Sequence, residues 1–183
     1  MKWQRIQSKA PVVMLVAALL PTTILGDHLP DAKLARGKDD VILAGVEVYK
    51  TPIDQILSSF GKPTSRKEVS PATGDAVGER LYVWKKRDIT IEVGTFIADQ
   101  AIFKGGLRET PRFVTVDGTD GTLGRTGRGL KLGDPSSAIA EVYGTRYVKQ
   151  GRRITLQWET TTTLEVRWNE EGIVNHIELL GPE

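Results

Sequence analysis

The sequence predicts an α+β fold of two tandem repeats behind an N-terminal signal peptide, each repeat being one helix packed on an antiparallel β-sheet. A helix pattern at residues 51–61 recurs at 134–144, so that Ile56 corresponds to Ile139. Self-similarity of this kind is typical of a duplicated structural unit. After each helix, apolar and polar residues alternate, which is typical of an antiparallel sheet with one buried and one solvated face.

The first 26 residues have the composition of a secretory signal peptide. The basic residues Lys2, Arg5 and Lys9 precede an apolar run from Pro11 to Gly26, and this segment contains no acidic residue. The run is shorter than the roughly 20 residues of a membrane-spanning helix, so we expect cleavage near Gly26. An uncleaved N-terminal anchor is the alternative. The chain is therefore predicted to be exported, either periplasmic or secreted.

Charge and cysteine content narrow the class of protein. The chain has 25 basic and 23 acidic residues. Without the three basic residues of the signal peptide, the chain has 22 basic and 23 acidic residues, a net charge of −1. We therefore expect no clustered positive surface that would bind nucleic acid. Contact with a membrane is expected only if the signal peptide stays uncleaved. The chain has no cysteine, which excludes both disulfides and a lipid-modified cysteine.

The first repeat unit, residues 41–116, follows a flexible leader at 27–40. It opens with a strand that is broken or bulged at Gly45. Thr51 is expected to cap the helix that follows, and Gly61 to end it. The apolar residues of this helix fall at helical spacing and form one buried stripe: Ile53, Ile56, Leu57 and Phe60.

Strands are expected to complete the first unit at residues 81–84, 89–93, 97–103 and 113–116. Between the helix and these strands, residues 63–80 are rich in Ser, Thr, Gly, Pro and charge. They predict a long irregular loop, and such loops in compact domains are often functional.

A glycine-rich connector at residues 117–129 leads to the second unit, residues 130–183. In that unit Asp134 is expected to cap the helix and Gly144 to end it. Four strands are predicted after it: 146–149, 154–158, 164–168 and 173–180.

Short motifs resemble a known family. Phe60-Gly61-Lys62-Pro63 looks like the helix ending of the SmpA/OmlA (BamE-like) outer-membrane assembly lipoproteins. The run from Arg128 to Asp134, followed by a helix and Tyr143-Gly144, resembles the opening common in that group. The tandem arrangement is similar to the secreted β-lactamase inhibitory protein. The resemblance implies a fold of helix-plus-sheet repeats and an exported, binding role.

No catalytic, cofactor or metal site is predicted. The two histidines, His28 and His176, have no sequence-local acid or cysteine in ligand spacing. No serine lies in a nucleophile-elbow motif. Asp117 and Asp120 lie in a Gly/Asp turn that lacks the remainder of a calcium-loop pattern.

Five residues are candidates for an interaction surface. Parity along the last strand places His176 on the solvated face, and Tyr82 and Trp84 could form a stacking platform. Arg125 and Arg128 belong to a small basic cluster in the connector. Alternation assigns the other strand tryptophans to the core instead: Trp158 and Trp168.

The function expected from these observations is that of an exported, non-catalytic protein-interaction module of the bacterial envelope or secreted fraction. An inhibitor-like role is one form that this function could take. Its partner would be another exported or envelope protein. Two alternatives stay open. One is a small exported hydrolase whose site assembles only in three dimensions. The other is a module that binds glycan or peptidoglycan, which requires Tyr82 or Trp84 to be exposed.

Overall fold

Among the residues that the structure describes, strands make up 50% and helices only 11%. The computed structural model describes residues 34–35, 37–70, 78–98 and 108–181, so the predicted signal peptide lies outside the described residues. The elements in chain order are β1 (Ile42–Leu43), β2 (Val46–Glu47), α1 (Ile53–Phe60), β3 (Ser65–Ser70), β4 (Gly78–Lys86), β5 (Ile89–Ala98), β6 (Arg108–Gly118), α2 (Ala138–Tyr143), β7 (Val148–Gln150), β8 (Arg153–Gln157), β9 (Thr163–Trp168) and β10 (Val174–Leu180).

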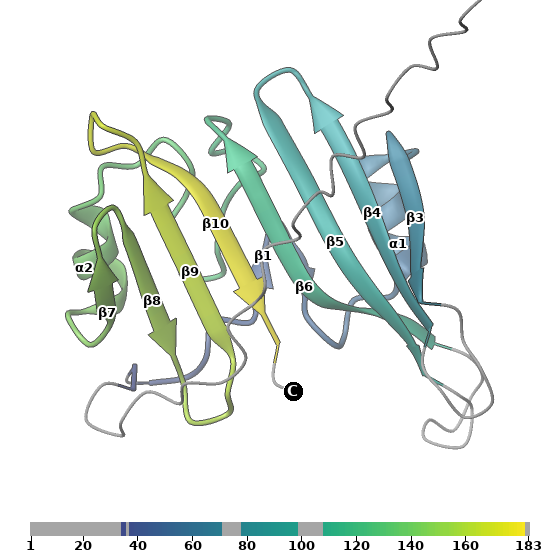
Figure 1. The fold of residues 1–183 in the computed structure, drawn as a ribbon, viewed down its shortest axis with the longest axis horizontal. Coiled ribbons are helices and arrows are strands. Elements are labelled where there is room, and N and C mark those ends of the chain that lie inside the picture. Colours follow the sequence, from purple (N-terminus) through teal and green to yellow (C-terminus); the bar gives the residue numbers. More distant parts are fainter. Residues whose placement is uncertain (1–33, 36, 71–77, 99–107, 182–183) are drawn as a thin grey trace, which may run out of the picture.

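Eight of the strands form one antiparallel sheet, in the order β3-β4-β5-β6-β10-β9-β8-β7 (Figure 1). The strands that follow α1 occupy one half of this sheet, and those that follow α2 occupy the other. The halves meet where β6 pairs with β10, with Val116 opposite Ile177 and Val114 opposite Leu179. All four side chains are fully buried, so the two halves share one continuous hydrophobic core.

The predicted fold of two α+β repeats, each with its own sheet, is therefore wrong. The finding that overturns it is the single eight-stranded sheet, accompanied by the two-stranded β1–β2 sheet. Alternation in the sequence indicates where strands lie, but does not indicate that β6 and β10 pair across the middle. The helices, of 8 and 6 residues, are also too short to dominate either half.

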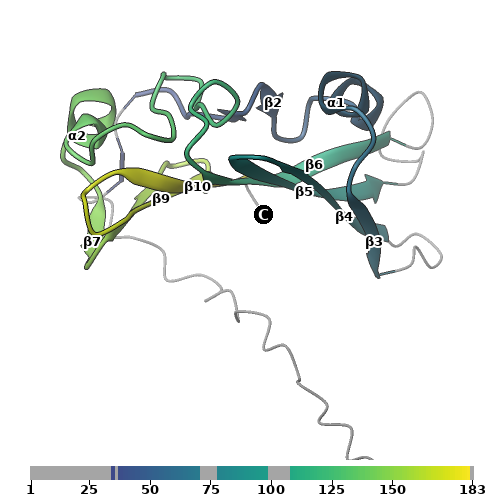
Figure 2. The same ribbon diagram turned by 90° about the horizontal axis from the view of Figure 1, so that it is seen from above.

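One face of the sheet is covered and the other is open (Figure 2). The two helices, the β1–β2 hairpin and the loop joining β6 to α2 all lie on the covered face. We call the opposite side the open face, because no described element lies over it. Figure 2 also shows both outer ends of the sheet, at β3 and β7, bending away from the helices, which makes the open face concave.

The core lies between the covered face and the helices. The predicted helix stripe is confirmed, because Ile56 is buried and Ile53, Leu57 and Phe60 pack against the core. Ile139 of α2 is also buried. The strands supply alternate residues to the same core: Tyr82, Trp84, Ile91, Val93, Val114, Val116, Ile154, Leu156, Leu164, Val166, Ile177 and Leu179.

Three local predictions need correction. The strand expected to break at Gly45 is a small hairpin, in which Ala44 and Gly45 both have positive φ, as a two-residue hairpin turn requires. Thr51 does not cap α1, because its Oγ1 accepts a hydrogen bond from the Glu47 N–H. Asp134 lies before the start of α2, and its carboxylate accepts from the Lys131 N–H.

Strand β3 lies inside the segment predicted to be an irregular loop. It is an edge strand in which Arg66, Lys67, Glu68 and Val69 are all exposed. Charged residues on an edge strand discourage pairing with other chains. Because charged residues also occupy the positions where apolar residues would alternate, the sequence of β3 does not show the pattern of a strand.

Chain segments outside the sheet pack onto the covered side. The end of the predicted leader contacts the core, where Asp40 is buried and accepts hydrogen bonds from Tyr143 Oη and the N–H groups of Gly127 and Arg128. These bonds join the leader to the connector. Within the described ranges, no helix has the length and apolar character needed to cross a membrane.

Candidate functional site

His176 reaches the open face through a β-bulge in β10. The pairing of β10 with β9 shifts register between Val174 and His176. Val174 and Ile177 consequently both face the core although they are three positions apart, and both are fully buried. A bulge re-aims the side chains beside it. His176 and Glu178 therefore share the open face, as parity along the strand predicts for His176.

His176 lies between acidic and basic neighbours on the adjacent strands. Its partner on β6 is Asp117, and its partner on β9 is Arg167. The Nδ1 atom of His176 is 2.6 Å from the Asp117 carboxylate. This hydrogen bond fixes the ring orientation and directs Nε2 away from Asp117. Only 13% of the His176 side chain is exposed.

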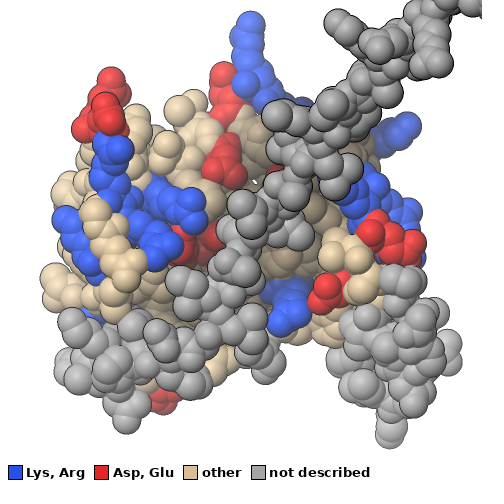
Figure 3. Space-filling model, viewed as in Figure 1, with Lys and Arg blue, Asp and Glu red and all other residues tan. Residues whose placement is uncertain are grey.

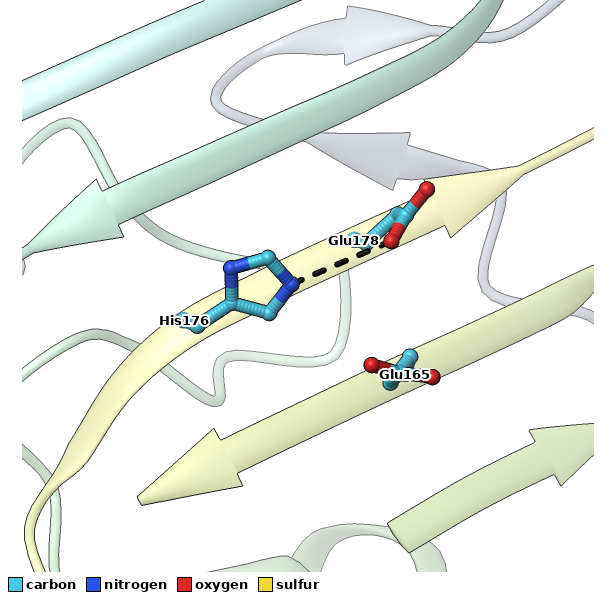
Figure 4. A group of neighbouring side chains, drawn as sticks. All are labelled: Glu165, His176 and Glu178. Carbon is cyan, nitrogen blue, oxygen red and sulfur yellow. Dashed lines mark ion pairs between the residues drawn. The ribbon is translucent and has the colours of Figure 1, made fainter. Parts of the chain in front are cut away.

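Two glutamates lie on the Nε2 side of the ring (Figure 4). Glu178 follows two residues later on the same strand, and its carboxylate is 3.8 Å from Nε2, beyond hydrogen-bond reach. Glu165 lies directly opposite Glu178 on β9. One ligand atom from each of Glu165, His176 and Glu178 can be chosen so that all lie within 4.8 Å of one another.

Two arginines neutralise Glu165. Its Oε1 atom is 2.5 Å from Arg167, and its Oε2 atom is 3.5 Å from Arg153. The cluster thus combines three carboxylates, two guanidinium groups and one imidazole. Figure 3, which looks onto the open face, shows the basic side chains gathered over β8 and β9 with acidic side chains beside them.

The carboxylates favour the charged form of His176. Burial alone would lower the pKa of the imidazole. The hydrogen bond to Asp117, the polar contact with Glu178 and the charge of Asp117 outweigh burial and the charge of Arg167, and they raise the pKa of His176 to about 9. The ring is therefore protonated at neutral pH. Its Nε2 atom is buried and has no hydrogen-bond partner among the described residues.

An apolar strip runs beside the charged cluster. Phe113 lies opposite Gly94 on β5 and opposite Leu180 on β10. A Cβ atom at Gly94 would come within 1.9 Å of the Phe113 ring, so the ring occupies the space that a side chain at Gly94 would fill. Leu81 lies opposite Gly94 from the other side. The open face therefore offers an aromatic and aliphatic strip next to a row of charges.

The structure places two of the predicted surface residues in the core instead. Tyr82 is 3% exposed and donates a hydrogen bond to Glu109. Trp84 is 2% exposed, stacks on Tyr82 and donates from Nε1 to the Gly61 carbonyl. Neither ring can serve as a stacking platform for a ligand. The glycan-binding alternative, which required one of them to be exposed, loses its main support.

The two predicted arginines lie apart from His176, in the loop on the covered side. Arg125 is exposed and borders a surface hollow with Lys131 and Asp134. Arg128 lies 5.5 Å above the Tyr143 ring and 5.7 Å from the Trp158 ring, in cation–π contact with both. Of the five predicted surface residues, only His176 belongs to the open face.

Sequence reasoning did not find the partners of His176. In the sequence, Asp117 lies in a Gly/Asp turn with no sign of contact with His176, and Glu165 and Glu178 belong to no motif. One local signal was present, because residues i and i+2 of a strand share a face, which joins His176 with Glu178. The other two partners come from strands whose pairing with β10 the sequence does not reveal.

Comparison with known proteins identifies no relative. No protein-family model matches the chain, and neither the curated proteins nor the solved structures give a match. The resemblance to the SmpA/OmlA lipoproteins and to the β-lactamase inhibitory protein therefore stays a prediction.

Proposed function

We propose that this chain is an exported, non-catalytic interaction protein that binds another exported or envelope protein on the open face of its sheet. The open face consists of alternate strand residues, among them Leu81, Glu92, Phe113, Asp117, Glu165, Arg167, His176, Glu178 and Leu180. The observation that carries the proposal is this concave face, which no described element covers.

The chemistry of the open face fits a protein partner. Protein interfaces combine an apolar centre, often with an aromatic anchor, and a polar rim. Phe113 and Leu180 supply a partly exposed apolar strip, and the row through His176 supplies charges of both signs. A nucleic acid would need a predominantly basic surface, whereas on this face Arg153 and Arg167 are paired with Glu165.

Export is supported by the N-terminal sequence. The first 26 residues have a basic start and an apolar run. The absence of cysteine suits a chain that folds in an oxidising compartment without disulfides. We therefore place the partner in the periplasm, the envelope or the secreted fraction.

The proposal is tested by chemical crosslinking of the tagged full chain in its native cells, comparing wild type with Phe113→Ala. We expect one dominant exported protein to be captured by wild type and to be reduced at least tenfold with the variant. Glu141→Gln, at an exposed position on α2, is the matched control and should capture the same protein as wild type. Equal capture by Phe113→Ala, with its thermal unfolding unchanged, would overturn the proposal.

A further inference from the structure

We propose that Glu165, His176 and Glu178 form a three-ligand site for a divalent transition-metal ion such as Zn²⁺ on the open face. The site is independent of the proposed protein partner, because all three ligands come from this chain. It was not expected from the sequence, where no metal site was predicted.

The three side chains converge from two neighbouring strands. Glu178 and His176 come from β10, and Glu165 comes from β9 directly opposite Glu178. In a tetrahedral zinc site with bonds of about 2.0–2.1 Å, ligand atoms lie about 3.3 Å apart. The Nε2 to Glu178 distance of 3.8 Å is close to this value, and the whole set lies within 4.8 Å. We expect rotation of the glutamate side chains to bring the ligand atoms to this spacing when the ion binds.

The hydrogen bonding of His176 is that of a metal ligand. Histidines that bind metals usually donate their second ring N–H to a carboxylate, which orients the ring and raises its basicity. Asp117 occupies that position, 2.6 Å from Nδ1. The remaining nitrogen, Nε2, is buried and lacks a hydrogen-bond partner among the described residues, and Glu178 faces it. A metal ion at Nε2 would satisfy this atom.

The pairing of Glu165 with Glu178 provides a second reason. Like charges directly opposite on neighbouring strands destabilise a sheet. Arg153 and Arg167 offset the charge of Glu165, whereas among the described residues the charge of Glu178 is met by the 3.8 Å contact with His176 alone. A cation between the two carboxylates relieves their repulsion. The arginines oppose its charge, and we expect Glu165 to keep one oxygen on Arg167 while the other binds the metal.

The donor set selects the class of ion. One imidazole and two carboxylates suit Zn²⁺ and similar first-row divalent ions better than Ca²⁺, which prefers six to eight oxygen ligands. Three protein ligands leave a fourth tetrahedral position open. Because the site lies on the open face, that position is directed to solvent or to a bound partner.

The test is titration of the chelator-treated full chain with ZnCl₂ at about pH 8, where ligands deprotonate more readily, followed by calorimetry and by NMR of the histidine rings. The chain has only two histidines, so His28→Gln, which leaves His176 as the remaining histidine, assigns the signals. We expect one equivalent of Zn²⁺ to shift the His176 ring resonances and to leave those of His28 unchanged.

The variants then separate a built site from incidental binding. We expect Glu165→Gln and Glu178→Gln each to weaken Zn²⁺ binding at least tenfold, and Asp117→Asn to weaken it about 10–100-fold. Glu92→Gln, on the same face but outside the cluster, is the matched control and should bind as wild type does. Unchanged binding in Glu178→Gln, or a wild-type Kd weaker than about 1 mM, would overturn the site. Crosslinking of the protein partner is a separate readout, so either proposal can fail alone.

Discussion

The two faces of the sheet use the same strands for different purposes. On β10, Leu179 is fully buried in the core, whereas its neighbour Leu180 is partly exposed on the open face. The covered face carries the core that stabilises the fold. The open face contributes little to the core, so a side chain there can be replaced without creating a cavity in the core. Strand alternation thus allows one sheet to carry both a core and a binding surface.

Two buried polar groups, one on each side of the sheet, illustrate a related difference, although the core atom Trp158 Nε1 also has no hydrogen-bond partner among the described residues. On the covered side the buried Asp40 carboxylate is satisfied by Tyr143 and by two backbone N–H groups. On the open face His176 keeps one buried nitrogen without a hydrogen-bond partner among the described residues. A satisfied network stabilises a fold, whereas an unsatisfied atom calls for an explanation, which is often functional.

The largest expected effect is on the covered face. Leu179→Ala should lower the free energy of unfolding by about 2–5 kcal/mol, because it leaves a cavity in the core. Leu180→Ala, one residue later, should lower it by about 1 kcal/mol or less. Urea unfolding of both variants measures the difference, and equal losses would contradict the assignment of the two faces.

The charged cluster predicts a pH dependence of stability. The pKa of His176 is raised to about 9 in the folded chain, against about 6.5 when unfolded. Its contribution, roughly 3 kcal/mol, is fully present below about pH 6.5 and is lost as the pH rises to about 9.

The measurement for this pH dependence is urea unfolding with a chelator at several pH values between these limits. His176→Gln is the control, because it removes the titrating group. The difference in stability between wild type and the variant should shrink as the pH rises. A constant difference would show that the carboxylates do not stabilise the imidazolium.

The buried network on the covered side predicts a smaller effect. Tyr143→Phe should lower the free energy of unfolding by about 1–3 kcal/mol, because the Asp40 carboxylate and Thr126 lose their hydrogen bonds to the phenol. Thermal unfolding measures it. Tyr147→Phe, at a half-buried position, is the comparison and should change stability less.

The smallest expected effect is that of an exposed ion pair on the open face. Arg153 contacts Glu165 at 3.5 Å and its side chain is 38% exposed. Arg153→Gln should change stability by less than about 1 kcal/mol, and added salt should reduce the change. A loss above about 2 kcal/mol would mean that the cluster is a structural element of the fold.

Much of the local structure could be predicted from the sequence, whereas the assembly of the strands could not. The spacing of Ile53, Ile56 and Phe60 predicts α1 correctly, and alternation finds the strands that carry Trp84 and Trp158. Pairing between β6 and β10 depends on contacts between residues about 60 positions apart, such as His176 with Asp117. Local periodicity contains no information on such contacts.

The same limit explains the candidate site. Parity predicts that His176 lies on the solvated face, and its spacing from Glu178 was readable along one strand. Glu165 and Asp117 become neighbours only through the sheet order. The prediction that Tyr82 and Trp84 lie on the surface is wrong because alternation in β4 is weak. Leu81 and Val83, which face the open side, are as apolar as the two buried residues.

The most direct test of the account is photocrosslinking in native cells from each face in turn. A photoreactive amino acid at position 180 reports on the open face, and one at the exposed position 141 of α2 reports on the covered side. We expect position 180 to capture one exported protein and position 141 not to capture it. Capture of the same protein only from position 141 would contradict the claim that the open face of the sheet is the binding surface.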